Sequence, residues 1–206
     1  MIRVVIADDQ GLIRSALATT LDLEDDLTVV GRAATCAEVV RVCAETQPDV
    51  VLLDVQMPDG GLDAEDGIDA IPALLQAAPE ARVIVVTTFG RPGYLQRSMA
   101  NGAVGFLVKD APVERLIQGI RGVATGMHVV DPELAVASLS IGSSPLSERE
   151  ALVLAASAGG ASTEQIAARV HLSEGTVRNY LSAAIGKLGA RNRAEALRTA
   201  TDNGWV

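Results

Sequence analysis

The feature that most constrains this chain is a regular alternation of aliphatic runs and helix-patterned segments in residues 1–125. The aliphatic runs span residues 3–7, 27–32, 50–54, 83–87 and 105–108. The segments with helical periodicity span residues 11–23, 36–46, 67–77, 93–101 and 112–125. Parallel strands need crossover connections, so this order predicts an α/β domain with a doubly wound, five-stranded parallel sheet and helices on both faces.

Polar residues interrupt the aliphatic runs at the points where the predicted strands end. In chain order they are Asp8, Asp9, Asp54, Thr87 and Lys109. The carboxyl ends of parallel strands meet at one edge of an open α/β sheet, and ligands bind there. We therefore expect these side chains to lie close together.

Such a cluster of carboxylates predicts a bound cation. Neighbouring like charges repel unless a cation is present, and oxygen ligands favour Mg²⁺, which is readily completed by phosphate. Asp54 is then expected to act as a nucleophile that forms an acyl phosphate, while Lys109 and the Thr87 hydroxyl offset the phosphoryl charge. The alternative is that Asp8 or Asp9 only caps the following helix and Lys109 pairs with a surface acid.

Two other functional classes fit the motifs less well. A Mg²⁺-dependent phosphatase would also form an aspartyl phosphate, but Val55 and Gln56 follow Asp54, so no second acid two residues on can serve as the general acid. Neither G-x-G-x-x-G nor G-x-x-x-x-G-K-[ST] occurs, which argues against a nucleotide-binding module.

After residue 125 the pattern changes. Residues 126–143 contain Gly, Pro and Ser and predict a linker with a helical turn at 132–138, whereas residues 144–206 predict an all-α domain of four short helices. The expected helix caps are Ser147, Ser162, Ser173 and Asn192. The first two of these begin S-x-x-E/Q capping boxes.

The helix expected at residues 173–188 has one apolar stripe and one polar face, and it follows a short helix and a tight turn. This is the pattern of a helix-turn-helix whose second helix enters the major groove of DNA. The residues predicted to contact DNA are Glu174, Gly175, Thr176, Arg178, Asn179, Ser182, Lys187 and Arg191. The alternative is that they form a solvated helix face.

Charge and composition limit the remaining possibilities. Residues 1–125 carry 10 Lys/Arg and 18 Asp/Glu, whereas residues 144–206 carry 7 and 6, so the tail has a net charge of only +1. Weak binding of DNA by one copy is expected, which favours a dimer on paired half-sites.

No apolar run approaches the roughly 20 residues of a membrane span, and no signal peptide is evident, which predicts a cytoplasmic protein. Cys36 and Cys43 lie too far apart on one helix to form a disulfide.

Several motifs carry a family resemblance. The segments "VVIADDQ", "PDVVLLDVQMP", "VIVVTTF" and "GAVGFLVKD" resemble the acidic pair, phosphoacceptor, switch threonine and lysine of response-regulator receiver domains. The tail from "PLSEREALVL" to "RNRAEAL" resembles the LuxR-type helix-turn-helix of the NarL/FixJ family. Within this family, "TTFGRPGY" and "LSEGTVRNYLS" are similar to DesR-type regulators.

The resemblance implies a flavodoxin-like receiver at residues 1–125 and a transcription factor rather than an enzyme. It implies that Asp9, Asp54 and the backbone carbonyl of Gln56 bind Mg²⁺, with Asp8 acting mainly through water. Asp54 would be phosphorylated by a sensor histidine kinase. Thr87 and Phe106 would couple this event to a homodimer surface on the segments 11–23 and 112–125, and the dimer would bind a double-stranded DNA operator.

Two departures from the family pattern stand out. Asp110 follows Lys109 where many receivers have a proline. The loop "MPDGGLDAEDGI" is extended and contains the acids Asp59, Asp63, Glu65 and Asp66. The loop could alter kinase docking or metal access, and the alternative is a solvated insertion without consequence.

Overall fold

The structure is a computed structural model that describes residues 1–206 except 63, 65, 89 and 140–143. The chain divides into two compact units, one of residues 1–90 and 95–135, the other of residues 91–94 and 136–206. Among the described residues, no helix has the length and apolar character needed to cross a membrane.

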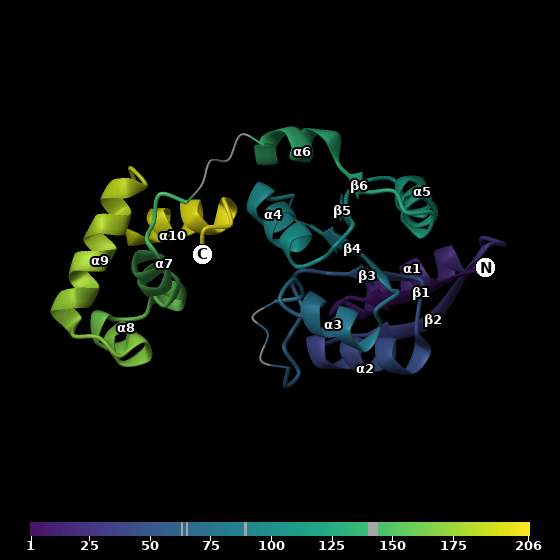
Figure 1. The fold of residues 1–206 in the computed structure, drawn as a ribbon, viewed down its shortest axis with the longest axis horizontal. Helices are drawn as coiled ribbons and strands as arrows, with labels where there is room; N and C mark the ends of the chain where they lie inside the picture. The colour runs from purple at the N-terminus through teal and green to yellow at the C-terminus, as the bar shows by residue number, and fades with distance from the viewer. Residues whose placement is uncertain (63, 65, 89, 140–143) are drawn as a thin grey trace. The chain divides into compact units, whose positions relative to one another are not determined.

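The first unit is built on one parallel sheet with the strand order β2-β1-β3-β4-β5-β6 (Figure 1). The strands are β1 (Ile2–Ala7), β2 (Leu27–Ala33), β3 (Val50–Leu53), β4 (Arg82–Thr87), β5 (Gly105–Val108) and β6 (Val129–Val130). The predicted doubly wound α/β fold is confirmed. The order places β1 and β3 side by side, so the residues that follow these two strands are neighbours.

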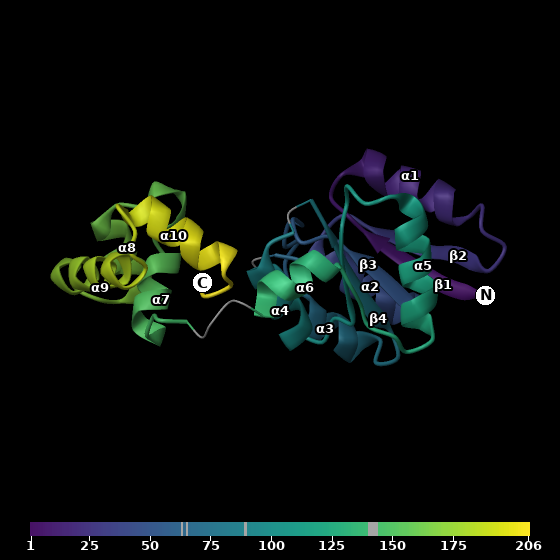
Figure 2. The ribbon, with the colours of Figure 1, turned by 90° about the horizontal axis from the view of Figure 1, so that it is seen from above.

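The helices of this unit are α1 (Gly11–Leu21), α2 (Cys36–Thr46), α3 (Ile71–Ala77), α4 (Pro92–Ala100) and α5 (Val113–Ala124). Side chains of α1 and α5 share one buried apolar cluster with β1, β3, β4 and β5, so these helices cover the same face of the sheet (Figure 2). Helices α2 and α3 pack together on the other face (Figure 1). Burial of these aliphatic faces is the main stabilising contribution to the sheet.

The structure departs from the five-stranded prediction at β6. Val129 pairs with Gly105 and Val130 with Phe106, which extends the sheet by one strand within the predicted linker. An aliphatic pair of this length has no periodicity, so the sequence gives no strand signal. The predicted turn at 132–138 is a helix, α6 (Pro132–Leu139), and the Asp131 carboxylate accepts a hydrogen bond from the Glu133 N–H at 3.0 Å at its start.

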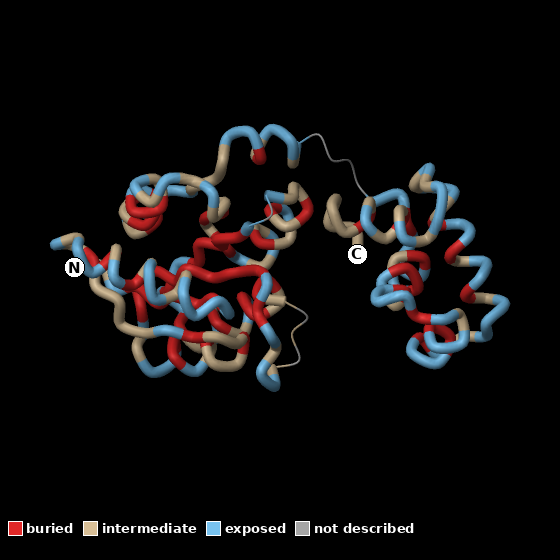
Figure 3. Tube along the Cα trace, turned by 180° about the vertical axis from the view of Figure 1, so that it is seen from behind, coloured by how far each residue is buried: buried red, intermediate tan, exposed pale blue. Residues whose placement is uncertain are grey.

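The second unit contains α7 (Glu148–Ala155), a 3₁₀ turn (Ala158–Gly160), α8 (Thr163–Val170), α9 (Glu174–Lys187) and α10 (Arg193–Asp202). The four predicted caps are confirmed, and Ser147 and Ser162 each form a complete capping box. A buried core of its own runs through these helices and includes Val153, Ile166, Val177, Leu181 and Ala196 (Figure 3).

Both cysteines lie on α2, buried and free, as the sequence predicts. Burial raises the pKa of Cys36 to about 11 and that of Cys43 to about 12. Neither thiol is therefore ionised near neutral pH, which agrees with a packing role.

Candidate functional site

The three acids predicted at the strand ends form one cluster. The carboxylates of Asp8, Asp9 and Asp54 each offer an oxygen atom, and these atoms lie within 4.8 Å of one another. Ala7 pairs with Leu53 in adjacent parallel strands, so Asp8 and Asp54 leave the sheet side by side. Asp8 and Asp54 are buried, whereas Asp9 is exposed at the mouth of the site.

Lys109 joins this cluster from the end of β5. Its Nζ atom lies 2.7 Å from Asp8 Oδ2 and 2.8 Å from Asp54 Oδ2, although Asp110 follows it in place of the proline of many receivers. Burial alone would lower the pKa of Lys109, but its hydrogen bonds to Asp54 and Asp8 raise this pKa above the ordinary value. The side chain is thus an ammonium that pairs with buried acids, and the alternative of a surface ion pair is wrong.

The cluster keeps an excess of negative charge. Burial raises the pKa of Asp54, and the hydrogen bond from Lys109 only partly offsets that effect. One ammonium faces three carboxylates, so a hard divalent cation with oxygen ligands fits the donor set.

The other predicted site residues lie around the cluster. Thr87 is buried at the end of β4, and Phe106 is buried in β5, where it pairs with Val85 of β4. Gln56 follows the phosphoacceptor candidate by two residues, and its backbone N–H hydrogen-bonds the Asp54 carboxylate. This N–H stabilises the ionised form of Asp54 and holds the carboxyl group near the loop.

Sequence reasoning missed two residues that shape the site. The guanidinium of Arg14 in α1 donates a hydrogen bond to the backbone carbonyl of Asp8. Gly67 approaches Asp54 so closely that a Cβ atom at residue 67 would lie 2.0 Å from the Asp54 carbonyl oxygen. The Asp66-Gly67 pair before α3 is a turn signal that could have indicated this approach.

The two acids of the extended loop that the structure describes both have partners, one within the loop and one on α4. The carboxylate of Asp59 accepts hydrogen bonds from the backbone N–H groups of Gly61, Leu62 and Ala64 at 2.8–2.9 Å. Asp66 pairs with Arg97 of α4 at 3.1 Å. Asp63 and Glu65 lie outside the described residues.

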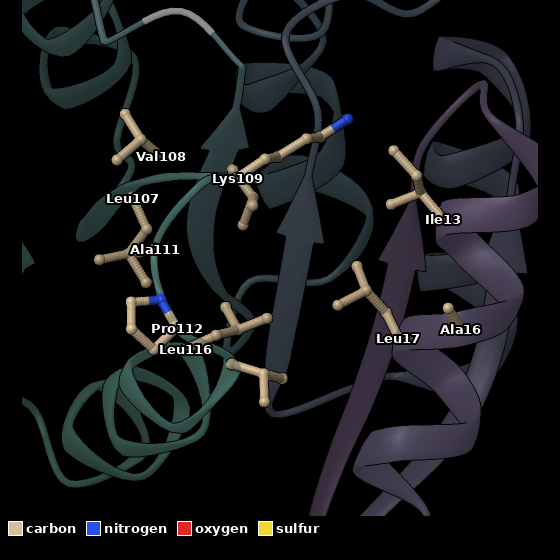
Figure 4. A pocket seen from close by; sticks show the side chains of 11 residues that line it. Ile13, Ala16, Leu17, Leu107, Val108, Lys109, Ala111, Pro112 and Leu116 are labelled. Atoms are coloured by element: carbon tan, nitrogen blue, oxygen red, sulfur yellow. The ribbon is translucent and has the colours of Figure 1, made fainter.

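An apolar pocket of about 240 Å³ lies beside Lys109, between α1 and the start of α5. Figure 4 shows Ile13 and Leu17 of α1 across the pocket from Pro112 and Leu116. The face that carries this pocket therefore adjoins the carboxylate cluster through Lys109.

In the second unit, α8 and α9 form the predicted helix-turn-helix. His171 ends α8 in the left-handed conformation, with φ 52°, and Ser173 begins α9. Thr176 is half-buried, and its hydroxyl lies 2.8 Å from that of Ser173. The other predicted DNA contacts are exposed; they are Glu174, Gly175, Arg178, Asn179, Ser182, Lys187 and Arg191.

Comparison with known proteins agrees with this architecture. Residues 4–121 match the family described as "Response regulator receiver domain", and residues 144–200 match "Bacterial regulatory proteins, luxR family". The chain therefore belongs to the LuxR-family response regulators, which join a receiver to a helix-turn-helix DNA-binding domain. It is a transcription regulator of the two-component type and not an enzyme.

Two bacterial regulators align with this chain over its whole length. The transcriptional regulatory protein DesR of Bacillus subtilis is 39% identical over 205 residues, which is 100% of this chain and 99% of that protein. The response regulator RamR of Streptomyces coelicolor is 39% identical over 206 residues, 100% of this chain and 98% of that protein.

Solved structures show the same fold. The crystal structure of the response regulator ChrA, from a heme-sensing two-component system, is 33% identical with a TM-score of 0.57 and covers 100% of this chain and 98% of that one. RcsB of Salmonella enterica serovar Typhimurium, bound to promoter DNA with a phosphomimetic, has a TM-score of 0.68, 23% identity and full coverage of both chains. At that identity the likeness to RcsB concerns the fold alone.

Proposed function

We propose that Asp54 accepts a phosphoryl group from a sensor histidine kinase and that the acyl phosphate promotes a homodimer that binds an operator. The observation that carries this proposal is the half-buried Lys109, whose ammonium lies within hydrogen-bond distance of both Asp8 and Asp54. A site with a nucleophilic carboxylate, an acid pair and a fixed cation suits phosphoryl transfer, in which positioning and charge stabilisation supply most of the catalysis.

The residues of the chain have distinct roles in this proposal. Asp9, Asp54 and the backbone carbonyl of Gln56 hold Mg²⁺, with Asp8 acting mainly through water, and the ion supplies electrostatic stabilisation of the phosphoryl oxygens. An Asp54 oxygen attacks phosphorus, the P–N bond to the kinase histidine breaks, and an acyl phosphate forms. Lys109 then pairs with a phosphoryl oxygen instead of Asp54, and the Thr87 hydroxyl donates to another.

The proposed dimer surface consists of α1 and α5. Thr87 of β4 and Phe106 of β5 couple the change at Asp54 to this surface. The surface has the apolar character that a dimer interface needs, because the pocket between the helices is aliphatic and Leu12 of α1 is 84% exposed.

In the dimer, two tails bind paired half-sites of double-stranded DNA. Arg178 and Asn179 have the donors to read guanine and adenine edges, with Glu174, Gly175 and Ser182 beside them on the same face of α9. Thr176, Lys187 and Arg191 hold phosphates. We further propose a receiver at residues 1–125, a linker at 126–143, a DNA-binding domain at 144–206, and a cytoplasmic location, where the DNA lies.

Light scattering tests the proposal. The molar mass of the full chain is measured with Mg²⁺ before and after addition of beryllofluoride, which mimics a phosphoryl group on aspartate. A doubling of mass is expected, and Asp54→Asn serves as the control that stays monomeric. An unchanged mass when beryllofluoride is shown to bind would contradict the dimer mechanism.

A further inference from the structure

Two of the cations proposed to hold DNA phosphates already pair with carboxylates of their own unit. Lys187 Nζ lies 2.6 Å from Glu150 Oε2, and Arg191 Nε lies 3.1 Å from Glu195 Oε2. In each pair the acid is the more buried partner: the side chains of Glu150 and Lys187 are 8% and 43% exposed, and those of Glu195 and Arg191 are 24% and 85% exposed. The cations can therefore leave the pairs more easily than the acids can.

Backbone hydrogen bonds hold both acids in place. Glu150 Oε2 accepts the Ser147 N–H at 2.7 Å, and Glu195 Oε2 accepts the Arg191 N–H at 2.7 Å. The hydrogen bond from Lys187 lowers the pKa of Glu150, and that from the Arg191 side chain lowers the pKa of Glu195. The backbone N–H groups of Ser147 and Arg191 lower the same two pKa values, and these bonds remain when DNA attracts the cation, so each carboxylate stays ionised and fixed.

We propose that Glu150 and Glu195 are specificity-determining residues that compete with DNA phosphates for Lys187 and Arg191. This inference rests on the proposed function, in which these two cations contact the DNA backbone. Phosphate contacts supply affinity for DNA of any sequence, whereas base contacts discriminate between sequences. A fixed internal carboxylate weakens the affinity for DNA of any sequence, and discrimination between sequences is left to the exposed face of α9.

Three other arginines of the tail agree with a restrained electrostatic attraction. Arg169 and Arg193 donate hydrogen bonds to the backbone carbonyls of Ala156 and Ala161, so they support the fold of the unit. The pair of Arg178 and Glu174 is looser, at 3.5 Å, with side chains 65% and 50% exposed. Such an exposed pair costs little to break, which suits a residue that reads bases.

The first experiment measures the affinity of the full chain for a duplex of random sequence at low salt. Glu195→Gln removes the charge while its amide oxygen can still accept the Arg191 N–H, and we expect random-sequence DNA to bind about threefold to tenfold tighter. Glu164→Gln, on the exposed first turn of α8, is the matched control because it changes the net charge equally. The increase in affinity from Glu164→Gln should be clearly smaller than that from Glu195→Gln.

A double-mutant cycle with Arg191→Gln separates competition from general charge. Arg191→Gln alone should weaken binding, and in its background the gain from Glu195→Gln should fall to that of Glu164→Gln. If Arg191→Gln weakens binding but Glu195→Gln gains no more than the control, the competition inference is wrong and the phosphate role of Arg191 stands. If Arg191→Gln has no effect, the proposed phosphate contact fails and the inference fails with it.

A second pair of variants tests the inference if Glu195→Gln does not fold. If thermal melting shows that Glu195→Gln disrupts α10, the same cycle is measured with Glu150→Gln and Lys187→Gln. An excess gain that needs Lys187 supports the inference, and a gain that persists without Lys187 overturns it.

Discussion

At the scale of single residues, the phosphoacceptor candidate lies in an environment that penalises its charge. The Asp54 side chain is 3% exposed, and its pKa is raised above 3.8 mainly by burial. The folded protein therefore binds a proton at Asp54 more tightly than the unfolded chain does, so this residue favours folding more as the pH falls. Above the raised pKa of Asp54, where both states are ionised, the buried carboxylate lowers the free energy of unfolding.

Asp54→Asn should for this reason stabilise the protein at neutral pH without Mg²⁺. We expect the melting temperature of the receiver at pH 7.5 to rise by about 2–6 °C, and the gain to shrink as the pH falls toward the raised pKa of Asp54. Thermal melting of the full chain at several pH values measures this, with Asp25→Asn, an exposed acid, as the control. A lower melting temperature of Asp54→Asn at pH 7.5 would show that the bond to Lys109 outweighs the burial penalty.

The strand-end residues could be predicted because they interrupt aliphatic runs, and the order of a doubly wound sheet brings such interruptions to one edge. The sequence could not reveal that Lys109 bonds Asp8 as well as Asp54, because that contact depends on side-chain conformations at two strand ends. Arg14 was missed for a similar reason: its contact is to a backbone carbonyl, which leaves no residue pattern.

At the scale of elements, the connection between β3 and α3 links the segment after Asp54 to α4. Gly67 donates its N–H to the Val55 carbonyl at 2.8 Å. The preceding residue, Asp66, pairs with Arg97 of α4, and Arg97 also pairs with Asp69 at 2.8 Å. The extension of the loop therefore leaves its last turn anchored to both the site and a helix. This use of Asp66 favours an internal role over an open acidic docking surface for that residue.

Gly67→Ala should disturb the site through this connection. A Cβ atom at residue 67 would lie 2.0 Å from the Asp54 carbonyl oxygen, so the backbone of one of the two segments must move. We expect a loss of about 1–3 kcal/mol of stability and a weaker dimerisation response to beryllofluoride. Gly186→Ala in α9 is the control, because its Cβ would meet nothing within 4 Å. Equal melting and equal responses of the two variants would contradict the close approach.

The helix starts of the second unit were the most predictable elements, because a capping residue has a local cause. Ser147, Ser162, Ser173 and Asn192 each accept a hydrogen bond from a backbone N–H within the next three residues. β6 was missed because its stability comes from pairing with β5 rather than from its own sequence. The start of α3 was predicted four residues early, at 67 instead of 71, because the turn around Asp66 and Gly67 continues the helical spacing of apolar residues.

At the scale of the whole molecule, the two parts of the chain differ in net charge. Residues 1–125 carry an excess of acids that suits a cation-dependent site, whereas residues 144–206 have a net charge of +1. Two internal carboxylates further restrain the cations of the tail. Under the proposed function, a single copy then has little sequence-independent affinity for DNA, and operator binding depends on joining two copies.

This dependence predicts the form of the operator. Selection from a pool of random duplexes with beryllofluoride and Mg²⁺ should enrich sequences that contain two related half-sites about one helical turn, roughly 10 base pairs, apart, because a symmetric dimer presents two α9 helices. Deleting one half-site should weaken binding about 100-fold or more, since the second tail then adds no base contacts. Asp54→Asn, taken through the same selection, should enrich no paired sites. Enrichment of single half-sites by the wild-type chain would mean that one tail suffices, and the restraint on its cations would then be too weak to require a dimer.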